Sequence, residues 1–439
     1  MLLRSLFKKL IPRLFLDAYH YVLAQTGAFL YAYPSRAMVI LGVTGTRGKT
    51  TTANYLWSVC NAAGFKTGLI GTANIRIGEE ARLNQSHMTM PGRFMLQHLL
   101  AQMRSAGCEI AIVETPSEGI EQFRERGISY DVLVLNTLYP EYLETHGRSF
   151  ERLKQMLHRP FAALARQPRK TLRGKPVPKI IAVNAALVEK DLFLAHAADV
   201  KTTYGTAPDA AVRATGVVTT PRGVHFNVDS VQYELSLVGS FNVVNALAAI
   251  AVGQALGFTE ETIKDGLKRL TGVPGRMERI AIGQSFTVFV DYAHDGPSIE
   301  AALTACREIA AAKKARVIIL LGGEGGGRDQ RKRPVMGQIA AHLADACIVS
   351  NVDPYEDDPL EIIEDIARAA EAAGKQRGTD LFAIEDRRAG IAKALALAQP
   401  NDVVLVTGKG AEQSIVIRGV SYDWDDRLIV AEALKQLSP

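Results

Sequence analysis

The sequence predicts an α/β protein in which a central domain of the phosphate-loop (P-loop) type, with a mostly parallel sheet, precedes a C-terminal Rossmann-like α/β domain. Three observations predict this fold. Short apolar runs alternate with helix-like segments, the alternation restarts after a Gly- and Pro-containing stretch, and a glycine-rich turn follows the first run. Such alternation is typical of parallel strands joined by helices that cover both faces of the sheet. A short N-terminal helix is expected before the central domain.

The first series of elements is expected within the first 270 residues. Helical periodicity after the glycine-rich turn predicts a helix over 51–64, ending at Gly64. Alternating apolar and polar residues over 201–236 predict a β-rich edge or hairpin, and a helical pair is expected over 242–270. Short apolar runs predict buried strands at 38–43, 68–72, 109–114, 130–136 and 179–184.

A second α/β series follows the stretch GVPGRMERI (272–280), whose Gly and Pro residues suit a hinge between domains. Its strands are expected at 286–294, 316–323, 346–351 and 402–408. At 439 residues the chain is too long for one ordinary hydrophobic core. We therefore predict an N-terminal amphipathic helical segment (1–37), a central P-loop domain (38–273) and a C-terminal domain (274–439).

Composition and charge argue against several classes of function. A net charge of +5 is small for this length and does not favour nucleic acid as a partner, although it suits a phosphate-bearing substrate. The four cysteines lie far apart, without CxxC or CxxH spacing, which favours reduced thiols of a cytoplasmic protein over disulfides or a zinc site. They are Cys60, Cys108, Cys306 and Cys347.

The first 16 residues (1–16) form a basic segment with apolar residues at helical spacing, in which Pro12 would kink or interrupt a helix. The apolar residues are Leu3, Phe7, Leu10 and Leu14, and the basic ones are Arg4, Lys8, Lys9 and Arg13. Two interpretations stay open: a peripheral helix at the inner membrane face, or a helix docked on this protein or a partner. Charges interrupt the apolar residues, so a cleaved signal peptide is not expected. No apolar run reaches the roughly 20 residues of a membrane span.

The glycine-rich turn between the first strand and its helix carries the most specific local signal. Its pattern is GxxGxxGKTT, which departs from GxxxxGK[ST] because Gly42 stands one residue too early. Glycines let backbone N–H groups approach phosphate oxygens, Lys49 can neutralise phosphate charge, and a Thr50 or Thr51 hydroxyl can ligate Mg²⁺. A structural turn is the alternative. The predicted nucleotide-binding residues are Gly45, Thr46, Arg47, Gly48, Lys49, Thr50 and Thr51.

This loop resembles the GTxGKTT loop of the Mur ligase family, and the resemblance extends over most of residues 38–435. Several motifs in the family's order resemble those of its tripeptide-synthetase branch, MurE. They are GSFNVVNALAAIAVGQALG (239–257), GVPGRMERI (272–280), VDYAHDGPSIE (290–300), GGEGGGRDQRKRPVMG (322–337), NVDPYEDDP (351–359) and VTGKGAEQ (406–413).

The resemblance implies an ATP-dependent amide-bond ligase that adds an amino acid to a UDP-N-acetylmuramyl-dipeptide-like carboxylate through an acyl phosphate, in peptidoglycan precursor synthesis. ATP and Mg²⁺ are the implied cofactors, and the implied partners are small-molecule substrates. Lys49, Glu114 and Lys154 match the family's catalytic positions, with Glu114 as a magnesium ligand and Lys154 as the lysine that becomes carbamylated. An ordinary helix-surface lysine remains the alternative for Lys154.

The second metal site departs from the family pattern. Tyr142 stands where the family often has its metal-binding histidine, so His146 is the candidate ligand, with Glu141 or Glu144 as substitutes. The other implied contacts form three sets. Closure over ATP would involve Asn242, Asn245, Arg276, Asp291 and His294; the sugar-peptide would meet Thr89, Ser117, Gln122 and Arg124; and the incoming amino acid would meet Arg333, Asp353, Gly408 and Glu412.

The identity of the amino acid that is added is indicated only by charge. Tyr355 stands where diaminopimelate-adding enzymes have an arginine, so Asp353 and Glu412 favour a basic amino acid such as lysine or ornithine. A solvated acidic loop is the alternative. Only 37 residues precede the first strand of the P-loop domain, too few for the family's uridine-binding domain. We therefore expect an acceptor bound without that domain or on a different carrier, including a lipid-linked one.

Two rival functions stay open at this point. One is another amide ligase on the same scaffold, of the folylpolyglutamate or cyanophycin synthetase type. The other is a non-catalytic nucleotide-binding subunit, suggested by Tyr142 and by Ala411, which stands where the branch has histidine.

Overall fold

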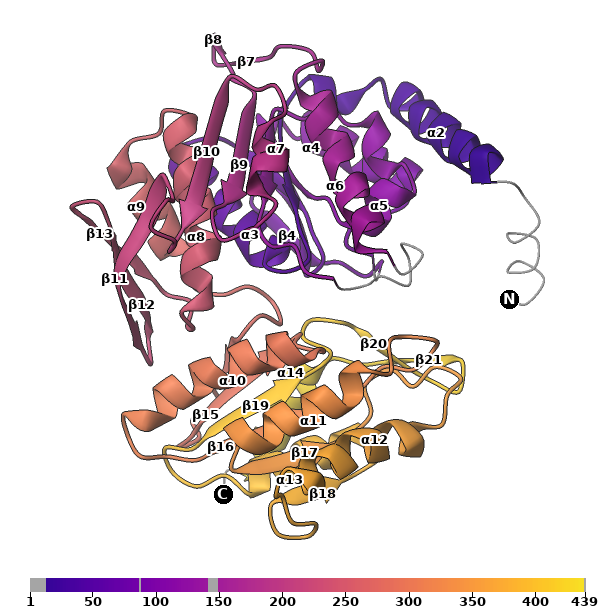
Figure 1. Ribbon diagram of the computed structural model, residues 1–439, viewed down its shortest axis with the longest axis vertical. Coiled ribbons are helices and arrows are strands. Elements are labelled where there is room, and N and C mark those ends of the chain that lie inside the picture. Colours follow the sequence, from indigo (N-terminus) through magenta and orange to yellow (C-terminus); the bar gives the residue numbers. More distant parts are fainter. Residues whose placement is uncertain (1–12, 87, 141–148, 438–439) are drawn as a thin grey trace. The chain divides into compact units, whose positions relative to one another are not determined.

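The structure is a computed structural model that describes residues 13–86, 88–140 and 149–437. The described residues form two compact units (Figure 1). Unit 1 takes those within Met1–Thr215, Val228–Val231 and Val244–Arg269, and unit 2 those within Gly216–Asn227, Gln232–Val243 and Leu270–Pro439. The division into segments 1–37, 38–273 and 274–439 remains a prediction.

The larger sheet has eleven strands in the order β13-β12-β11-β10-β9-β6-β1-β5-β2-β3-β4. From β11 to β2 its neighbours pair in parallel, whereas β3 pairs antiparallel with both β2 and β4. The strands are β1 (Val39–Thr44), β2 (Thr67–Ile70), β3 (Asn74–Ile77), β4 (Glu80–Leu83), β5 (Ile110–Glu114), β6 (Val132–Leu135), β9 (Ile180–Asn184), β10 (Val200–Gly205), β11 (Val212–Thr220), β12 (Gly223–Val228) and β13 (Val231–Leu235). The predicted mostly parallel sheet is confirmed.

Helices flank the parallel strands of unit 1, and α4 and α6 share one hydrophobic core with them. Helix α3 contacts β1, β2 and β5 and packs against α9, where a Cβ at Gly266 would lie 2.5 Å from the Cα of Val59. The helical elements are α2 (Arg13–Leu30), η1 (Pro34–Arg36), α3 (Lys49–Ala62), α4 (Arg93–Ser105), α5 (Ser117–Glu121), η2 (Arg124–Gly127), α6 (Phe150–Leu164), α7 (Lys190–Leu194), α8 (Phe241–Ala255) and α9 (Glu260–Arg269). A short hairpin, β7 (Thr171–Leu172) and β8 (Lys175–Pro176), completes this region.

Unit 2 contains a six-stranded sheet in the order β14-β15-β19-β16-β17-β18, parallel except for β14. Its strands are β14 (Glu278–Ile280), β15 (Thr287–Asp291), β16 (Val317–Leu321), β17 (Ala346–Val349), β18 (Leu381–Ala383) and β19 (Val403–Thr407), with a separate hairpin β20 (Ser414–Ile417) and β21 (Val420–Asp423). Its helices are α10 (Gly296–Ala311), α11 (Lys332–Leu343), α12 (Pro359–Ala372), α13 (Arg387–Ala396) and α14 (Asp426–Leu437).

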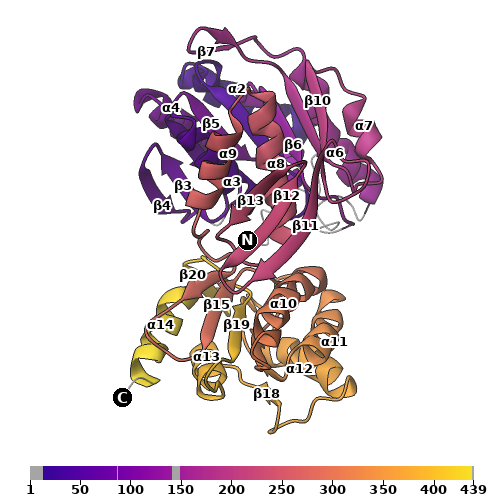
Figure 2. The same cartoon turned by 90° about the vertical axis from the view of Figure 1, so that its left-hand side faces the viewer.

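Both faces of this second sheet are covered (Figure 2). Alternate residues of β16 explain the two layers, since Val317, Ile319 and Leu321 join the core under α10, α11 and α12. Ile318 and Leu320 join the opposite core under α13 and α14. The period of two along a strand therefore sorts one apolar run into two cores, and the Rossmann-like prediction is confirmed.

Several element boundaries differ from the predicted ones in ways that matter for the site. Helix α3 begins at Lys49 rather than at residue 51, and β2 ends at Ile70, which leaves Gly71 and Thr72 outside the strand. All four cysteines are buried and free, and burial raises the pKa of Cys60 and of Cys347 to about 12. Among the helices in the described ranges, none has the length and apolar character needed to cross a membrane.

Candidate active site

The glycine-rich loop follows β1, the strand between β5 and β6, and leads into α3. The polypeptide after β6 holds it in place: Thr46 N donates to Thr137 O at 2.9 Å, and Arg47 N donates to the Thr137 hydroxyl at 2.8 Å. The Arg47 guanidinium lies 5.0 Å from the centroid of the Tyr139 ring. Because Thr137 bonds to two successive loop residues, the polypeptide after β6 defines the shape of the loop.

Two glycines in the loop adopt backbone conformations that other residues rarely take. Gly45 has φ 120° and Gly48, which precedes α3, has φ 78°. A Cβ at Gly45 would lie 2.6 Å from Thr137 O, and one at Gly48 would lie 2.4 Å from Asn245 Oδ1. Both glycines are therefore required by conformation and by space.

The Lys49 ammonium bends back over the loop, where it donates to the carbonyls of Gly45 at 2.7 Å and Thr46 at 2.9 Å. Lys49 is also the first residue of α3, so its charge adds to the positive end of the helix dipole. Thr51 is buried in the same first turn. Helix N-terminus, loop amides and ammonium together form an anion-binding arrangement.

The carboxylate of Glu114 is completely buried at the end of β5, opposite Val43 of β1. It accepts hydrogen bonds from the Thr50 hydroxyl at 3.1 Å, the Thr72 backbone N–H at 2.9 Å and the Thr72 hydroxyl at 2.9 Å. The Thr72 hydroxyl also bonds to that of Thr89 at 3.0 Å. Thr50, Thr72, Thr89 and Glu114, here called the Glu114 cluster, thus place one carboxylate and three hydroxyls beside the phosphate loop.

A second polar network lies under Gly48. Asn136 donates from Nδ2 to the Thr52 hydroxyl at 2.7 Å, and the Thr52 hydroxyl donates to Asn245 Oδ1 at 3.3 Å. The Tyr204 hydroxyl donates to Asn136 Oδ1 at 2.7 Å. Asn245 of α8 is therefore brought to the base of the loop. Asn242 is the second residue of the same helix and donates to Val238 O at 2.7 Å.

The residues predicted to meet the sugar-peptide lie beside the Glu114 cluster. Arg124 donates to Gln122 Oε1 at 2.8 Å and to the carbonyl of Met90, the residue after Thr89. Ser117 opens α5 and bonds to Glu118 at 3.4 Å. Burial lowers the pKa of Arg124, and the nearby charge of Arg93 lowers it further. Two arginines and a chain of hydroxyls suit an anionic substrate group.

Lys154 and His146 are the two other residues predicted to hold or orient the metal ion. Within the described ranges, every partner of Lys154 lies on its own helix: its ammonium pairs with Glu151, lies 5.1 Å from the Phe150 ring centroid and interacts electrostatically with His158. His146 lies outside the described residues, as do Glu141, Tyr142 and Glu144. The described residues contain no group of three or more His, Cys, Asp or Glu side chains that could hold a metal ion.

In unit 2, the predicted hinge residues form a compact polar group. The Asp291 carboxylate is buried and accepts from the backbone of Met277 and of Ala293, each at 2.7 Å. Burial raises the pKa of Asp291, while Arg276 opposes that effect. The Arg276 guanidinium lies 4.4 Å from the Tyr292 ring centroid. His294 Nδ1 lies 2.8 Å from Tyr292 O, so Nδ1 is the protonated nitrogen, because a carbonyl can only accept.

A buried lysine missed by the sequence analysis joins the two predicted acids. Lys409 Nζ lies 2.6 Å from Asp353 Oδ2 and 2.6 Å from Glu412 Oε2. Tyr292 donates to the other oxygen of Glu412 at 3.3 Å, and Gly408 N donates to Asp291 O at 3.2 Å. Burial raises the pKa of Asp353, whereas Lys409 lowers it. Two carboxylates around one ammonium leave one net negative charge.

Arg333 also has acidic neighbours. It is buried on α11, donates to Asp365 at 3.0 Å and lies 4.0 Å from Asp357. Glu324 pairs with Lys332 at 3.1 Å. Although burial alone would raise the pKa of Glu324, electrostatic interactions with His294, Lys332 and Arg328 lower it to about 2. The predicted amino-acid contacts of unit 2 therefore gather around Glu324, Lys409 and Asp291.

Comparisons with known proteins identify the family. The Mur ligase middle domain matches residues 43–253, and the Mur ligase glutamate ligase domain matches residues 275–410. A UDP-N-acetylmuramyl-tripeptide synthetase from Roseiflexus sp. (strain RS-1) is 38% identical over 436 residues, covering 97% of this chain and 84% of the relative. The chain belongs to the Mur ligase family. The predicted family, fold class and enzyme class are confirmed.

Other relatives of this Mur ligase carry the name of a single activity. A UDP-N-acetylmuramoyl-L-alanyl-D-glutamate–2,6-diaminopimelate ligase from Halalkalibacterium halodurans is 34% identical, covering 94% of this chain and 82% of the relative. A solved ligase of the same name has a TM-score of 0.63 at 27% identity, covering 95% of this chain and 84% of that one. A folylpolyglutamate synthase from Mycobacterium tuberculosis complexed with ADP, at 16% identity and a TM-score of 0.66, shares the fold alone; the match covers 95% of this chain and 94% of that one.

Several residues of this Mur ligase site were missed from the sequence. Asn136 and Thr137 directly follow the strand β6, and Thr72 follows β2 after a glycine. Polar residues at the carboxyl ends of parallel strands are a signal that could have found all three. Lys409 carries the same signal, since it follows β19 after a glycine, but its partner Asp353 is far away in sequence and could not be predicted from it.

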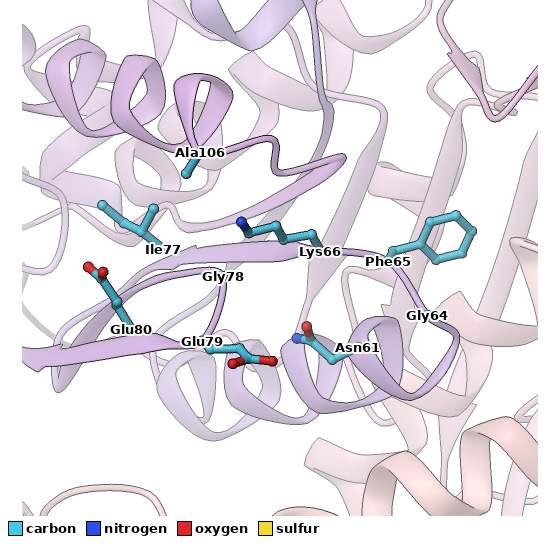
Figure 3. Close-up of a pocket in the computed structure, with 9 residues that line it drawn as sticks. All are labelled: Asn61, Gly64, Phe65, Lys66, Ile77, Gly78, Glu79, Glu80 and Ala106. Carbon is cyan, nitrogen blue, oxygen red and sulfur yellow. The ribbon is translucent and has the colours of Figure 1, made fainter.

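A hollow of about 610 Å³ lies elsewhere in unit 1, at the C-terminal end of α3 (Figure 3). Lys66, Glu79 and Glu80 line it and are exposed. Since α3 rises about 1.5 Å per residue over 14 residues, its ends are roughly 20 Å apart. The hollow is therefore separate from the Glu114 cluster.

Proposed function

We propose that this Mur ligase uses ATP to join the amino group of an amino acid to the carboxylate of a muramyl-peptide-type acceptor. One observation carries the proposal: the Lys49 loop and the Glu114 cluster meet at the N-terminus of α3, so phosphate-binding and metal-binding groups are adjacent. The names of the relatives support an amino-acid-adding ligase acting on a UDP-muramyl-peptide.

Binding of the triphosphate is assigned to the loop. Lys49 donates to two loop carbonyls, and these bonds are exchanged for stronger charge-assisted bonds when phosphate oxygens enter. Backbone N–H groups at the N-terminus of α3 supply further donors, whereas those of Thr46 and Arg47 bond to Thr137. Asn245 supports the loop from below through Gly48 and Thr52.

The residues of the Glu114 cluster fit a hard divalent cation. Mg²⁺ is commonly held by one or two carboxylates or hydroxyls and several waters, and Glu114 and Thr50 are such donors beside the loop. When bound, Mg²⁺ supplies positive charge that offsets the crowding of phosphate oxygens. Carbamylation of Lys154 is part of the proposal, and a carbamate carbon signal in ¹³C-bicarbonate NMR, lost in Lys154→Arg, would test it.

The proposed reaction has two steps. An acceptor carboxylate oxygen attacks the γ-phosphorus, the bond to the β–γ bridging oxygen breaks, and ADP leaves with that electron pair. The amine of the incoming amino acid then attacks the acyl carbon, phosphate departs, and the amine proton passes to solvent. Cationic groups near the acceptor, Arg93 and Arg124, suit the orientation of its anionic groups.

The proposed amino acid carries a cationic side chain. Asp353, Glu412 and Lys409 together leave one negative charge, which favours an ammonium over a second carboxylate. Tyr355 has no charge with which to hold a carboxylate. The relatives named as diaminopimelate ligases make that amino acid the main comparison.

The test measures phosphate release from ATP with magnesium, an acceptor and a panel of L-amino acids. The experiment is run with two acceptors, UDP-muramyl-dipeptide and its lipid-linked counterpart. We expect release that depends on both acceptor and amino acid, faster with lysine or ornithine than with diaminopimelate, and absent in Lys49→Ala. Phosphate release that occurs without either acceptor contradicts the proposal. So does a rate of phosphate release that is unchanged in Lys49→Ala.

We also propose peripheral association with the inner membrane face, which the basic segment 1–16 suggested. That segment lies largely outside the described residues. Support from the described chain comes from helix α2, which begins within this segment at Arg13.

A further inference from the structure

Helix α2 is fixed on unit 1 through one face. Ala24 and Ala28 are buried there, and a Cβ at Gly127 of η2 would lie 3.1 Å from the Cβ of Ala28. Gln25 donates from its side chain to Arg126 O at 2.8 Å. Because small side chains allow this close approach to η2, the orientation of α2 about its own axis is determined.

The opposite face of α2 is apolar and exposed. Phe15, Tyr19, Val22, Phe29 and Leu30 recur at spacings that share one side of a helix, and each is 58–68% exposed. Phe94 of α4 continues this surface, since its ring lies 3.6 Å from the position of a Cβ at Gly27. These six residues are called the α2–α4 face (α2 and α4 are seen in Figure 1). A contiguous apolar surface of this kind marks an interaction site.

Basic residues border the α2–α4 face. Arg36 lies 4.1 Å from the Tyr33 ring centroid after α2, and Arg104 donates to Ala32 O at 3.2 Å. Across residues 13–36 and 93–105 the sequence has four arginines and a single acid, Asp17. The two described segments that form the face therefore carry more basic than acidic residues.

We propose that the α2–α4 face binds an anionic membrane surface, with its apolar side chains among the headgroups and its arginines on lipid phosphates. Phe and Tyr rings are enriched at such interfaces, and each nearby cation adds attraction to anionic lipid. A second copy of this chain is disfavoured as the occupant, because a twofold interface would set the same arginines against each other. Where two helices pack together through apolar residues, the residues that flank the contact instead carry charges of both signs.

The test uses the full chain and vesicle co-sedimentation, which does not depend on ligase activity. Vesicles contain either phosphatidylcholine alone or phosphatidylcholine with 30% phosphatidylglycerol, at about 0.1 M salt, where charges act over roughly 10 Å. The double variant Val22→Glu/Phe29→Glu replaces two exposed apolar side chains of the α2–α4 face with carboxylates. Val188→Glu, at a residue that is 93% exposed, is the matched control. Thermal unfolding checks that all three proteins fold.

We expect the wild type and Val188→Glu to pellet with the anionic vesicles and at least tenfold less with the neutral ones. Val22→Glu/Phe29→Glu should bind at least tenfold more weakly than the wild type. Absence of wild-type binding, or equal binding by the double variant, overturns the proposal. So does a wild-type dimer that the double variant converts to monomer without any vesicle binding. A truncation of residues 1–12 that abolishes binding, beside a double variant that binds normally, would assign the contact to that segment instead.

Discussion

Gly48 occupies the position where β1, the phosphate loop and α3 meet. Its left-handed backbone ends the loop, and its missing side chain leaves room for Asn245 Oδ1 and Asn136 Nδ2, which a Cβ would approach to 2.4 and 2.8 Å. Two separate constraints thus act on one residue. They can be separated experimentally, because Gly107 has the same φ of 78° and a Cβ added there would have no atom within 4 Å.

We predict that Gly48→Ala lowers ATP affinity at least about tenfold, or 1.4 kcal/mol, because Asn245 must move and the loop with it. Gly107→Ala should lose stability through backbone strain, about 1–2 kcal/mol, and bind ATP normally. Titration calorimetry with magnesium and ATP measures the first effect and urea unfolding the second. Equal ATP affinity in both variants would mean that the contact with Asn245 is unimportant.

Glu125 is a buried acid that the proposed reaction does not use. It pairs with Arg159 at 2.7 Å and with Arg126 at 3.4 Å, and its Oε2 has no hydrogen-bond partner in the described structure. Burial raises the pKa of Glu125 to about 7, against the opposing effect of Arg159 and Arg126. The folded protein therefore holds this proton at a pH where the unfolded chain has released it.

We predict that Glu125 makes the protein less stable as pH rises from about 4.5 to about 7. Below this window both states are protonated, and above it both are ionised, so the change is confined between the two pKa values. A shift from 4.5 to about 7 corresponds to roughly 3 kcal/mol as an order of magnitude. Glu125→Gln should lack this slope in urea unfolding measured across pH. Parallel curves for the two proteins would show that Glu125 ionises normally.

At the scale of elements, Arg387 connects four parts of unit 2. From the start of α13 it donates to both carboxylate oxygens of Asp426 in α14, at 2.9 and 2.5 Å, and to the carbonyls of Asn351 and Thr407 at 2.9 and 2.7 Å. Asn351 precedes the loop that carries Asp353, and Thr407 precedes Gly408. The buried arginine therefore supports both loops that carry the predicted amino-acid contacts.

We predict that Arg387→Met destabilises the protein by about 3–5 kcal/mol, because it leaves Asp426 buried without a counter-charge. The double variant Arg387→Met/Asp426→Leu should recover most of this loss. Arg388→Met is the matched control: Arg388 pairs with Glu432 of α14 at 2.8 Å, but both side chains are exposed, so its change should stay below about 1 kcal/mol. Urea unfolding compares the three, and a double variant as unstable as Arg387→Met would contradict the explanation.

At the scale of the whole molecule, two units have separate hydrophobic cores. One core packs α4 and α6 on the larger sheet, and two others cover both faces of the smaller sheet. We predict two calorimetric transitions, with Gly107→Ala lowering only one and Arg387→Met only the other, because each substitution acts within its own unit. A single transition shifted by both variants would show that the units unfold together.

Local patterns in the sequence determined the buried parallel strands and part of the candidate site. The apolar runs predicted β1, β2, β5, β6, β9, β15, β16, β17 and β19, and the glycine-rich turn with Lys49 predicted the phosphate loop, because both signals lie within a few neighbouring residues. Glu114 could be predicted as well, since it ends an apolar run. Family resemblance supplied the remaining candidates, whose roles stay predictions.

Only the tertiary structure decided which distant residues meet. Thr72 reaches Glu114 because β2 pairs with β5, and Thr137 reaches the loop because β6 pairs with β1. Lys409 neutralises Asp353 across 56 residues, which altered the charge expected for the amino-acid site. Hydrophobic periodicity reports whether a residue is buried but not which strand lies beside it, so strand order, and with it the chemistry between strands, came from the fold alone.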